Sequence, residues 1–442
     1  MLLIIIFLFF DIYIFTKIML KNSFYAKYIS FFLLFNIVIL IISYIAPYDL
    51  YKVSDNVYLL YLLYIFCYSI SYIIVCKKTE NKTNDNKNNR EIIILKIKQF
   101  TNKKISKIII SILTLILLYY YMRYLKFTSN IEDKALLRGL FFTDFFNSYT
   151  EDLIYNNIIC SLSSIAAIFN AIMLTNNIKK NYFFYCSTIC LILTTLIGSG
   201  RMNLFFYILY CIISFLFLNN ISKEKLLKKI KSISKLIVIF LFIFIISLYA
   251  ISVRMGNLSN IYLLLENQIE QIIIYFTGSF RALEHYLKYG FETLNNYTIY
   301  KATFGGLEDI ISLFLNFIGI KHSSFNTLVG GITQSYIYIG NTTEFNAFYT
   351  CIMNFYADLG VVGVIFYSIL FGYITSIIVK KTENSKLIFN TILMIFFTVN
   401  INISSIYRWH LQSMAITCAI IIIIFIIILE KKGEKNENTM DS

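Results

Sequence analysis

The chain alternates between long apolar blocks and short polar clusters from end to end. A bilayer core about 30 Å thick is crossed by roughly 20 apolar residues in an α-helix, and each block is close to that length. A helix also satisfies all of its own backbone hydrogen bonds inside a membrane. The pattern therefore predicts an all-α polytopic membrane protein with about eleven transmembrane helices. The predicted spans are 1–16, 28–47, 57–76, 108–125, 156–178, 182–198, 202–219, 236–253, 358–379, 387–404 and 412–429.

The composition excludes a soluble fold. Of the 442 residues, 58% are hydrophobic and 14% are charged, whereas an ordinary soluble domain has about 25% charged residues. The opening MLLIIIFLFFDIYIF has no basic segment before it and no small-residue cleavage site, so we expect a first helix and not a removable signal. The eight cysteines lie within or beside apolar blocks without a CxxC pair, which is typical of packing residues. Neither a metal site nor a cofactor is expected.

The distribution of basic residues predicts the orientation. With the N-terminus outside, the cytoplasmic segments hold 27 of the 39 Lys and Arg residues, as the positive-inside rule requires. The same rule explains the net charge of +14 by loops that face anionic lipid, so nucleic acid is not an expected partner. We therefore expect three parts: a bundle of eight helices over 1–253, a large outer loop over 254–357, and C-terminal helices with a cytoplasmic tail over 358–442. The predicted cytoplasmic segments are 17–27, 77–107, 179–181, 220–235, 380–386 and 430–442.

Two polar stretches carry further predicted structure. The cytoplasmic linker 77–107 contains a short basic amphipathic piece, which indicates a helix lying on the membrane surface. The outer loop contains at least two helical pieces, 258–276 and 281–290, and Gly290 is the expected C-cap of the second. Within the second piece, ionisable residues recur at helical spacing and form one face. These residues are Arg281, Glu284, His285 and Lys288.

Arginine is concentrated on the outer side, although the chain as a whole prefers lysine. The predicted inside segments hold 26 Lys and one Arg, whereas the outside holds six of each. Any one outer arginine is better explained as an interfacial residue that extends its charge to water. As a set they indicate anion binding, because the guanidinium offers a rigid fork of donors that matches phosphate oxygens two at a time. The outer arginines are Arg123, Arg138, Arg201, Arg254, Arg281 and Arg408, and the three histidines, His285, His322 and His410, lie on the same side.

Two of these arginines stand at predicted membrane edges. Arg201 lies in LIGSGRMN, where two glycines allow a tight turn between short apolar blocks. Arg254 follows an apolar run in SVRMGN and lies at the same level. Both are placed where the pyrophosphate of a lipid would lie.

Three sequences resemble a known family, the Wzy-type O-antigen and capsular polysaccharide polymerases, which are oligosaccharide repeat-unit polymerases. They are LIGSGRMNLFFYILY, SVRMGN, and FNAFYTCIMNFYADLGVVGVIFYSILFGYI, and the third is the most specific. In it, Asn346, Asp358, Gly360 and Gly363 match an Asn-containing aromatic run followed by an acid, a glycine and a helix. The Arg-x10-Gly pattern that some members carry in two outer loops is absent. The two glycines are equally explained by close helix packing.

The resemblance implies an enzyme of the inner membrane, a glycosyltransferase that moves a growing glycan from undecaprenyl diphosphate onto the next lipid-linked repeat unit. Such a reaction needs groups that stabilise the departing diphosphate and a group that deprotonates the attacking hydroxyl. For deprotonation the alternatives are His285, His322, His410, Glu284 and Asp358, and Asp358 is equally explained as a residue of the helix N-terminus. The expected catalytic residues are Arg201, Arg254, Arg281, Asp358 and His410, and the expected substrate-binding residues are Arg408, Glu284, His285, His322 and Asn346.

The expected partners are the lipid-linked oligosaccharide and membrane lipid, together with a chain-length regulator and a flippase. Two other functions stay open. A ligase that transfers finished glycan would share the architecture and the chemistry. A flippase or transporter of lipid-linked oligosaccharide would carry charged residues midway along its helices, whereas the predicted spans are almost free of charge apart from Asp11 and show no internal repeat.

Overall fold

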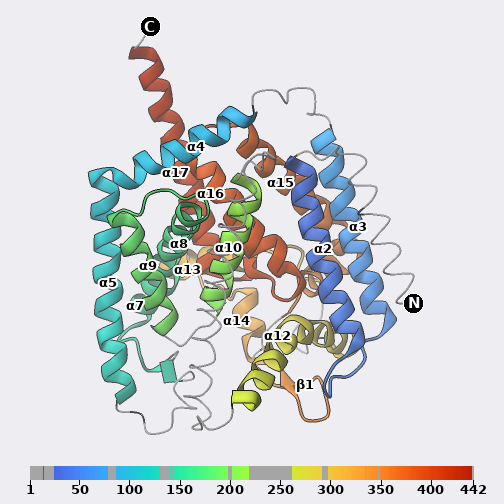
Figure 1. Ribbon diagram of the computed structural model, residues 1–442. Helices are drawn as coiled ribbons and strands as arrows, with labels where there is room; N and C mark the ends of the chain where they lie inside the picture. Colours follow the sequence, from blue (N-terminus) through green and yellow to red (C-terminus); the bar gives the residue numbers. More distant parts are fainter. Residues whose placement is uncertain are drawn as a thin grey trace. The chain divides into compact units, whose positions relative to one another are not determined.

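A computed structural model gives the fold as two compact units. The first unit holds residues 1–83, 269–383 and 400–417, and the second holds 84–268, 384–399 and 418–442. Helices make up nearly all of the described structure in both, beside a single two-stranded sheet in that part of the chain (Figure 1). The structure describes residues 13, 24–77, 86–129, 131, 140, 141, 143–197, 202–218, 261–290, 297–333, 335–345 and 349–440.

The first unit has a core of buried tyrosines on one face of α3. Tyr61, Tyr64 and Tyr68 recur every three or four residues and are fully buried. Each hydroxyl finds a partner, as apolar surroundings require: Tyr61 donates to the Ile406 carbonyl oxygen at 2.7 Å, and Tyr68 to Thr375 Oγ1 at 3.0 Å. The elements of this unit are α2 (Phe24–Ile45), α3 (Asp55–Lys77), α12 (Ile261–Tyr289) from residue 269, α13 (Gly305–Phe317), α14 (Phe325–Thr333), β1 (Ile337–Tyr338), β2 (Glu344–Phe345), α15 (Cys351–Asn384) to residue 383, η6 (Ser404–Ile406) and η7 (His410–Gln412).

At one end of the first unit, a hairpin docks on the loop between α2 and α3. Strands β1 and β2 are antiparallel, with Ile337 opposite Phe345. Asp49 of the loop accepts hydrogen bonds from the Thr342 backbone N–H at 2.7 Å and from the Thr343 hydroxyl at 2.5 Å. These hydrogen bonds hold the pKa of Asp49 at about 2, below its ordinary value of 3.8. The lower ends of α2 and α3 in Figure 1 are therefore covered by ordered chain.

Helix α12 corrects one expectation. The two predicted pieces, 258–276 and 281–290, are parts of one continuous 29-residue helix. Thr277 and Ser279, where the break was expected, are fully buried, and the backbone at Gly278 packs so closely that an added Cβ would lie 2.6 Å from the Phe345 ring. Tertiary packing thus carries the helix through a local sequence that favours a break. Gly290 ends the described helix with a φ of +66°, as a C-cap requires.

Helix α15 is bent at Asp358-Leu359-Gly360, within the sequence that carries the family resemblance. Leu359 and Gly360 leave helical geometry, and Gly360 has a φ of +61°, which a residue with a Cβ rarely adopts. The bend brings the Phe355 carbonyl so close to Gly363 that an added Cβ would lie 2.1 Å from its oxygen. Both glycines are therefore required by the backbone of the bend.

The second unit packs short helices through small and polar residues. Asn170 on α8 donates to the Phe184 carbonyl oxygen at 3.0 Å and to Ser187 Oγ at 2.9 Å on α9, and it accepts from Tyr207 on α10 at 2.6 Å. Such contacts replace the hydrophobic drive that is missing between helices in lipid. The elements of this unit are α4 (Asn86–Asn102), α5 (Lys104–Ser129), α7 (Tyr149–Ile154), η2 (Tyr155–Ile159), α8 (Cys160–Thr175), α9 (Tyr182–Leu196), α10 (Met202–Leu218), α16 (Ile388–Phe397) and α17 (Met414–Met440) from residue 418; η5 (Thr398–Ile403) joins the two units in sequence.

Helix α4 is the amphipathic helix expected in the 77–107 linker. Ile93 and Ile97 point one turn apart into the unit and are buried, whereas Lys98 is exposed. Phe100 stacks on Phe169 of α8 with ring centroids 5.1 Å apart. In Figure 1, α4 crosses the upper end of the second unit from α5, at an angle to the other helices.

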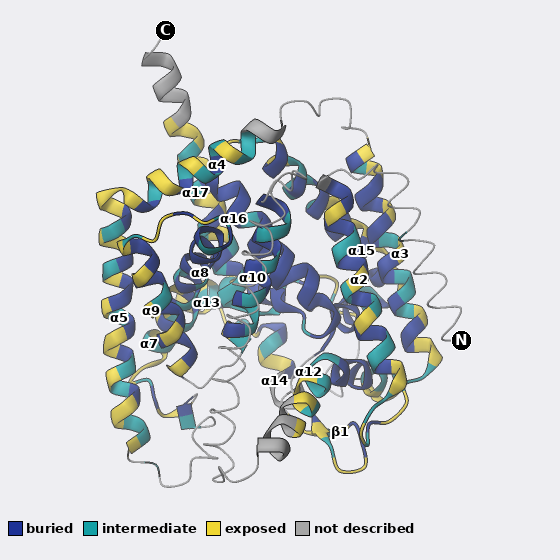
Figure 2. Ribbon diagram, viewed as in Figure 1, coloured by how far each residue is buried: buried dark blue, intermediate teal, exposed yellow. Residues whose placement is uncertain are grey.

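Seven described helices are long and apolar enough to cross a membrane, and α9 and α10 are shorter apolar helices. Together they coincide with nine of the eleven predicted spans. The two other predicted spans, 1–16 and 236–253, lie outside the described residues except for Tyr13. Figure 2 shows exposed residues along the length of α5, and many are large and apolar, such as Ile109 and Leu115. Such side chains suit contact with lipid, as in a polytopic membrane protein.

Candidate functional site

Arg281 is the first of the predicted site residues along the described chain, and it is buried with 5% of its surface exposed. Its guanidinium donates to three backbone carbonyl oxygens, those of Tyr51 at 2.6 Å, Thr277 at 3.0 Å and Ser43 at 3.3 Å. Burial lowers its pKa to about 10, which still leaves it cationic at neutral pH. Arg281 therefore fastens α12 to the end of α2 and to the loop before α3.

The neighbouring ionisable residues of α12 differ in their surroundings. Glu284 accepts from the Ser54 backbone N–H at 3.3 Å and forms an ion pair with Lys288 at 3.0 Å. His285 is exposed, and its ring lies 4.8 Å from that of Tyr289. Partial burial, and then the charge of Lys288, lower the pKa of His285. On the predicted ionisable face, Arg281 and Glu284 thus connect α12 to neighbouring segments, whereas His285 and Lys288 are exposed to solvent.

Asp358 is fully buried at the bend of α15, where its carboxyl group accepts three hydrogen bonds. The donors are the Thr298 hydroxyl at 2.5 Å, the Ala302 backbone N–H at 2.9 Å and the Thr303 backbone N–H at 2.8 Å. On the other side, the Trp409 indole donates to the Thr303 carbonyl oxygen at 2.7 Å. Asp358 and Trp409 together fix the turn 298–304, which leads directly into α13.

Helix α13 packs closely against the segment 410–413. An added Cβ at Gly306 would lie 2.4 Å from the Ser413 carbonyl oxygen, so only glycine fits this approach. Asn326, at the start of α14, donates to Asp309 Oδ2 and to the Gln412 carbonyl oxygen, both at 2.7 Å. Burial raises the pKa of Asp309. The first turns of α13 and α14 are therefore held in a fixed relation to each other.

Glu308 lies at the centre of this arrangement and is 1% exposed. Its Oε1 atom is 3.4 Å from the Lys301 Nζ and 3.4 Å from the His322 Nε2, and its Oε2 accepts from the Phe325 backbone N–H at 2.8 Å. The side chains of Lys301 and His322 are 35% and 28% exposed, so a buried carboxyl group is reached from solvent through two basic groups. We call Glu308, His322 and Lys301 the acid–base cluster.

The backbone of His322 is pinned as well. Its carbonyl oxygen accepts from the Ser312 hydroxyl at 2.8 Å and from the Asn316 side-chain amide at 3.0 Å, and its N–H donates to the Asn316 side-chain oxygen at 3.0 Å. A histidine held by a buried carboxylate on one ring nitrogen can present the other ring nitrogen as a base. The cluster therefore combines a buried carboxyl group with two basic groups that reach solvent.

His410 and Arg408 lie on the segment that supports α13. His410 is 4% exposed, and its ring meets that of Tyr407 edge-on with centroids 6.4 Å apart. Burial, and then the charge of Arg408, lower the pKa of His410 well below its ordinary value, so it is neutral at physiological pH. Arg408 is half-buried, and its backbone N–H donates to the Ser404 carbonyl oxygen at 2.7 Å. The structure thus brings His322 to the surface and keeps His410 inside.

Three predicted site residues, Arg201, Arg254 and Asn346, lie outside the described residues. In the other direction, Glu308 and Lys301 belong to the cluster but were not singled out from the sequence. The available signal was FGGLED, two adjacent acids just after two glycines at the start of an amphipathic helix. Among the described residues, no group of three or more His, Cys, Asp or Glu side chains is arranged to hold a metal ion.

Comparison with known proteins gives one match. A family model described as O-antigen polysaccharide polymerase Wzy matches residues 1–435, which is nearly the whole chain. No curated protein and no solved structure matches the chain.

Proposed function

The chain belongs to the O-antigen polysaccharide polymerase Wzy family, and from this membership we propose that it links undecaprenyl-diphosphate-bound oligosaccharide repeat units into O-antigen or capsular polysaccharide at the outer face of the inner membrane. Membership makes it an integral inner-membrane protein and a glycosyltransferase-like polymerase of polysaccharide repeat units. The carrier, the membrane face and the residues that act are the content of the proposal.

The observation that carries the proposal is the contact of buried Glu308 with His322 and Lys301. In the reaction, a hydroxyl of the incoming repeat unit attacks the anomeric carbon of the growing glycan. The bond between that carbon and the carrier diphosphate breaks, and the diphosphate leaves with the electron pair. His322 takes the proton of the attacking hydroxyl, and Glu308 stabilises the imidazolium that results.

Positive groups are needed at the departing diphosphate, which is already a good leaving group. Lys301 supplies one such charge within the acid–base cluster, and its side chain reaches solvent. We assign Arg201 and Arg254 to the diphosphate on the basis of their sequence positions, because a guanidinium can grip two phosphate oxygens. Charge stabilisation of this kind is usually the largest contribution to rate in group transfer.

Arg281 and Asp358 take a positioning part in this proposal. The polar atoms of both side chains form hydrogen bonds within the protein. Arg281 donates to backbone carbonyl oxygens, and Asp358 accepts from backbone N–H groups of the turn 298–304. By holding that turn, Asp358 sets the position of Lys301 and of the first turn of α13, which carries Glu308. The proposal therefore moves the proton-accepting role to His322, from among the five alternatives that the sequence left open.

The proposed function is tested by deleting the chain in its own host and analysing the glycan. We expect single repeat units on the cell surface or on the carrier lipid, and no long polymer. Long polymer that stays on the carrier would identify a ligase, because assembly would then be intact and only attachment lost. Carrier-linked units trapped on the cytoplasmic side, with no surface repeat, would identify a flippase. Restoration by the unchanged chain is the control.

A further inference from the structure

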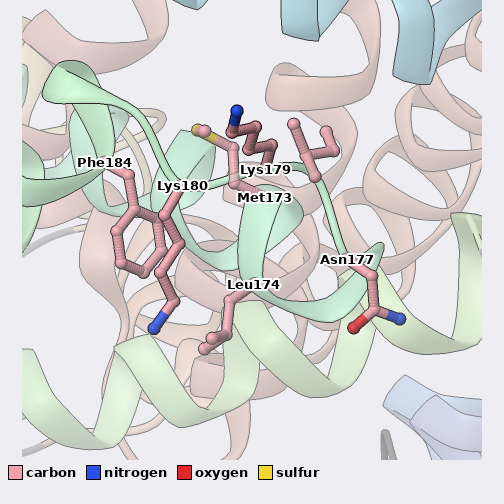
Figure 3. A pocket seen from close by; sticks show the side chains of 7 residues that line it. Met173, Leu174, Asn177, Lys179, Lys180 and Phe184 are labelled. Atoms are coloured by element: carbon pink, nitrogen blue, oxygen red, sulfur yellow. The ribbon is translucent and has the colours of Figure 1, made fainter.

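The turn between α8 and α9 in the second unit borders a cavity of about 220 Å³ that is partly open to solvent. Figure 3 shows the side chains that line it. One part of its lining is apolar and the other part is polar and basic. The apolar residues are Met173, Leu174, Ile178 and Phe184, and the polar residues are Asn177, Lys179 and Lys180. A cavity with this lining suits a ligand that has an anionic group joined to an apolar body.

The turn that shapes this cavity is ordered by its own hydrogen bonds. Asn177 has a φ of +55°, a left-handed conformation that asparagine tolerates better than most residues. The Ile178 N–H donates to the Met173 carbonyl oxygen at 3.0 Å, which closes the turn after α8. The backbone that lines this side of the cavity is therefore ordered by the turn itself.

Two lysines, Lys179 and Lys180, lie at this cavity. Among the residues that the structure describes, neither Lys179 nor Lys180 forms an ion pair with a carboxylate. The Lys180 ammonium lies 5.3 Å from the centroid of the Phe184 ring, which holds its position by a cation–π contact. Both lysine residues are exposed, so two positive charges are available to a ligand.

The cavity lies where lipid headgroups would be expected. A membrane-length helix ends at Thr175, and the next apolar helix begins at Tyr182, so the turn falls just beyond the apolar region. Asn181 donates to Thr101 Oγ1 and Asn102 Oδ1, each at 3.1 Å, which brings the turn beside the end of the amphipathic helix α4. Exposed lysines continue along that junction, at Lys98, Lys103 and Lys104.

We propose that this cavity binds the phosphate headgroup of an anionic membrane phospholipid. Lys179 and Lys180, whose side chains leave the turn toward opposite sides (Figure 3), supply the positive charge that attracts the phosphate, and the apolar wall receives the adjoining glycerol and acyl carbons. The cavity, at about 220 Å³, is smaller than pockets that hold whole small molecules, which are usually about 300–1,000 Å³. Its volume therefore suits the headgroup of a lipid rather than a whole ligand. Basic pockets between transmembrane helices are a recurrent form of headgroup site. The inference is independent of the proposed polymerase site, which lies in the first unit.

The test counts lipids retained by the purified chain. Protein in detergent is supplied with phosphatidylglycerol or phosphatidylcholine, and bound lipid is measured by native mass spectrometry. We expect the double variant Lys179→Gln, Lys180→Gln to bind phosphatidylglycerol roughly tenfold more weakly than the unchanged chain, with little change for phosphatidylcholine. The matched control is Lys431→Gln, Lys432→Gln, another exposed lysine pair in the second unit, which should behave as the unchanged chain does.

A second variant guards against a general loss of surface charge. Asn177→Asp keeps a residue that tolerates the left-handed turn but places a negative charge at the cavity, and it should also weaken phosphatidylglycerol binding. Equal binding by the lysine double variant and its control would overturn the proposal. So would displacement of phosphatidylglycerol by inorganic phosphate alone, which would indicate a free-phosphate site. Preferential retention of undecaprenyl phosphate over phosphatidylglycerol would overturn it in favour of the carrier lipid.

Discussion

The Nε2 atom of His322 lies 3.4 Å from the Oε1 atom of Glu308, a residue that is 1% exposed. This is longer than a normal hydrogen bond, and catalytic contacts of this kind often shorten when substrate binds. Asn316 and Ser312 hold the His322 backbone, so the contact needs only a small side-chain movement to close. In the proposed reaction, this relationship places a buried carboxyl group beside the histidine that takes the proton.

Asp358→Asn tests whether the bend of α15 positions the cluster. The amide would place an NH₂ group against a backbone N–H of Ala302 or Thr303, and leaving a buried donor unsatisfied costs about 1–3 kcal/mol. We expect a lower melting temperature for the purified protein and shorter polymer in cells. Asp55→Asn, at an exposed aspartate of the same unit, is the matched control and should change neither. Normal melting and normal polymer for Asp358→Asn would remove this residue from the account.

The contact of Asp49 with Thr342 and Thr343 predicts a firmly held hairpin. Asp49→Ala should raise hydrogen exchange in 337–345 by roughly tenfold, because the carboxylate no longer accepts the Thr342 N–H. The folded pKa of Asp49 is depressed from 3.8 to about 2, so its contribution is present above 3.8 and is lost only as the pH falls toward 2. Protection of this segment, corrected for intrinsic rates, should therefore be the same at pH 5 and pH 8. A fall in protection between those two values would contradict the assignment.

Arg201→Lys and Arg254→Lys separate a grip on diphosphate from simple interfacial anchoring. Lysine keeps the charge but loses the fork, and one lost transition-state contact costs on the order of 2.7–4 kcal/mol, or about a hundredfold or more in rate. Polymer length should collapse at normal protein level. Arg90→Lys on α4 is the control and should leave polymer unchanged. Near-normal polymer from both outer variants would show that these arginines only anchor the chain at the interface.

The orientation is tested by labelling single cysteines from the outer side, in a chain whose eight native cysteines are replaced. A cysteine at Ser323, which is exposed and adjoins His322, should react with a membrane-impermeant reagent. A cysteine at Lys98, exposed on α4, should react only after the membrane is opened. The opposite pattern would place the cluster on the cytoplasmic side and would refute an outer-face reaction.

The membrane fold could be predicted because it depends on the lengths of apolar blocks, which the sequence displays directly. Nine predicted spans coincide with described helices, and the basic amphipathic piece expected within 77–107 corresponds to α4. The division of α12 into two pieces was wrong for a physical reason. Thr277, Gly278 and Ser279 disfavour a helix locally, but their burial against the unit, including close contact of Gly278 with Phe345, keeps the helix continuous.

The site was harder to predict, since some of the expected residues bind partners that are distant in sequence. Arg281 was read as an anion-binding residue from its type and side, yet its donors reach backbone carbonyl oxygens of Ser43 and Tyr51, about 230 positions earlier. Glu308 stands in FGGLED, and nothing in that local sequence indicates that a lysine and a histidine lie beside it. Ser312 and Asn316, on the same helix as Glu308, hold the His322 backbone and bring the two side chains together.

The proposed reaction depends most on proton transfer to His322 beside Glu308. A double-mutant cycle on Glu308 and His322 tests this step most directly. The measurement is the initial rate of polymer formation by purified protein in liposomes, with lipid-linked repeat units as substrate. Glu344→Gln, at an exposed glutamate of the same unit, is the matched control, and melting temperatures check that each variant is folded.

We predict that His322→Gln lowers the rate by about a hundredfold or more, since general-base catalysis contributes typically 10²–10⁴-fold. Glu308→Gln should cause a loss of similar order, and the two changes together should cost little more than either one, because residues that act as a unit are not additive. Near-normal rates for both single variants, with melting temperatures unchanged, would contradict the account and show that the proton is taken elsewhere.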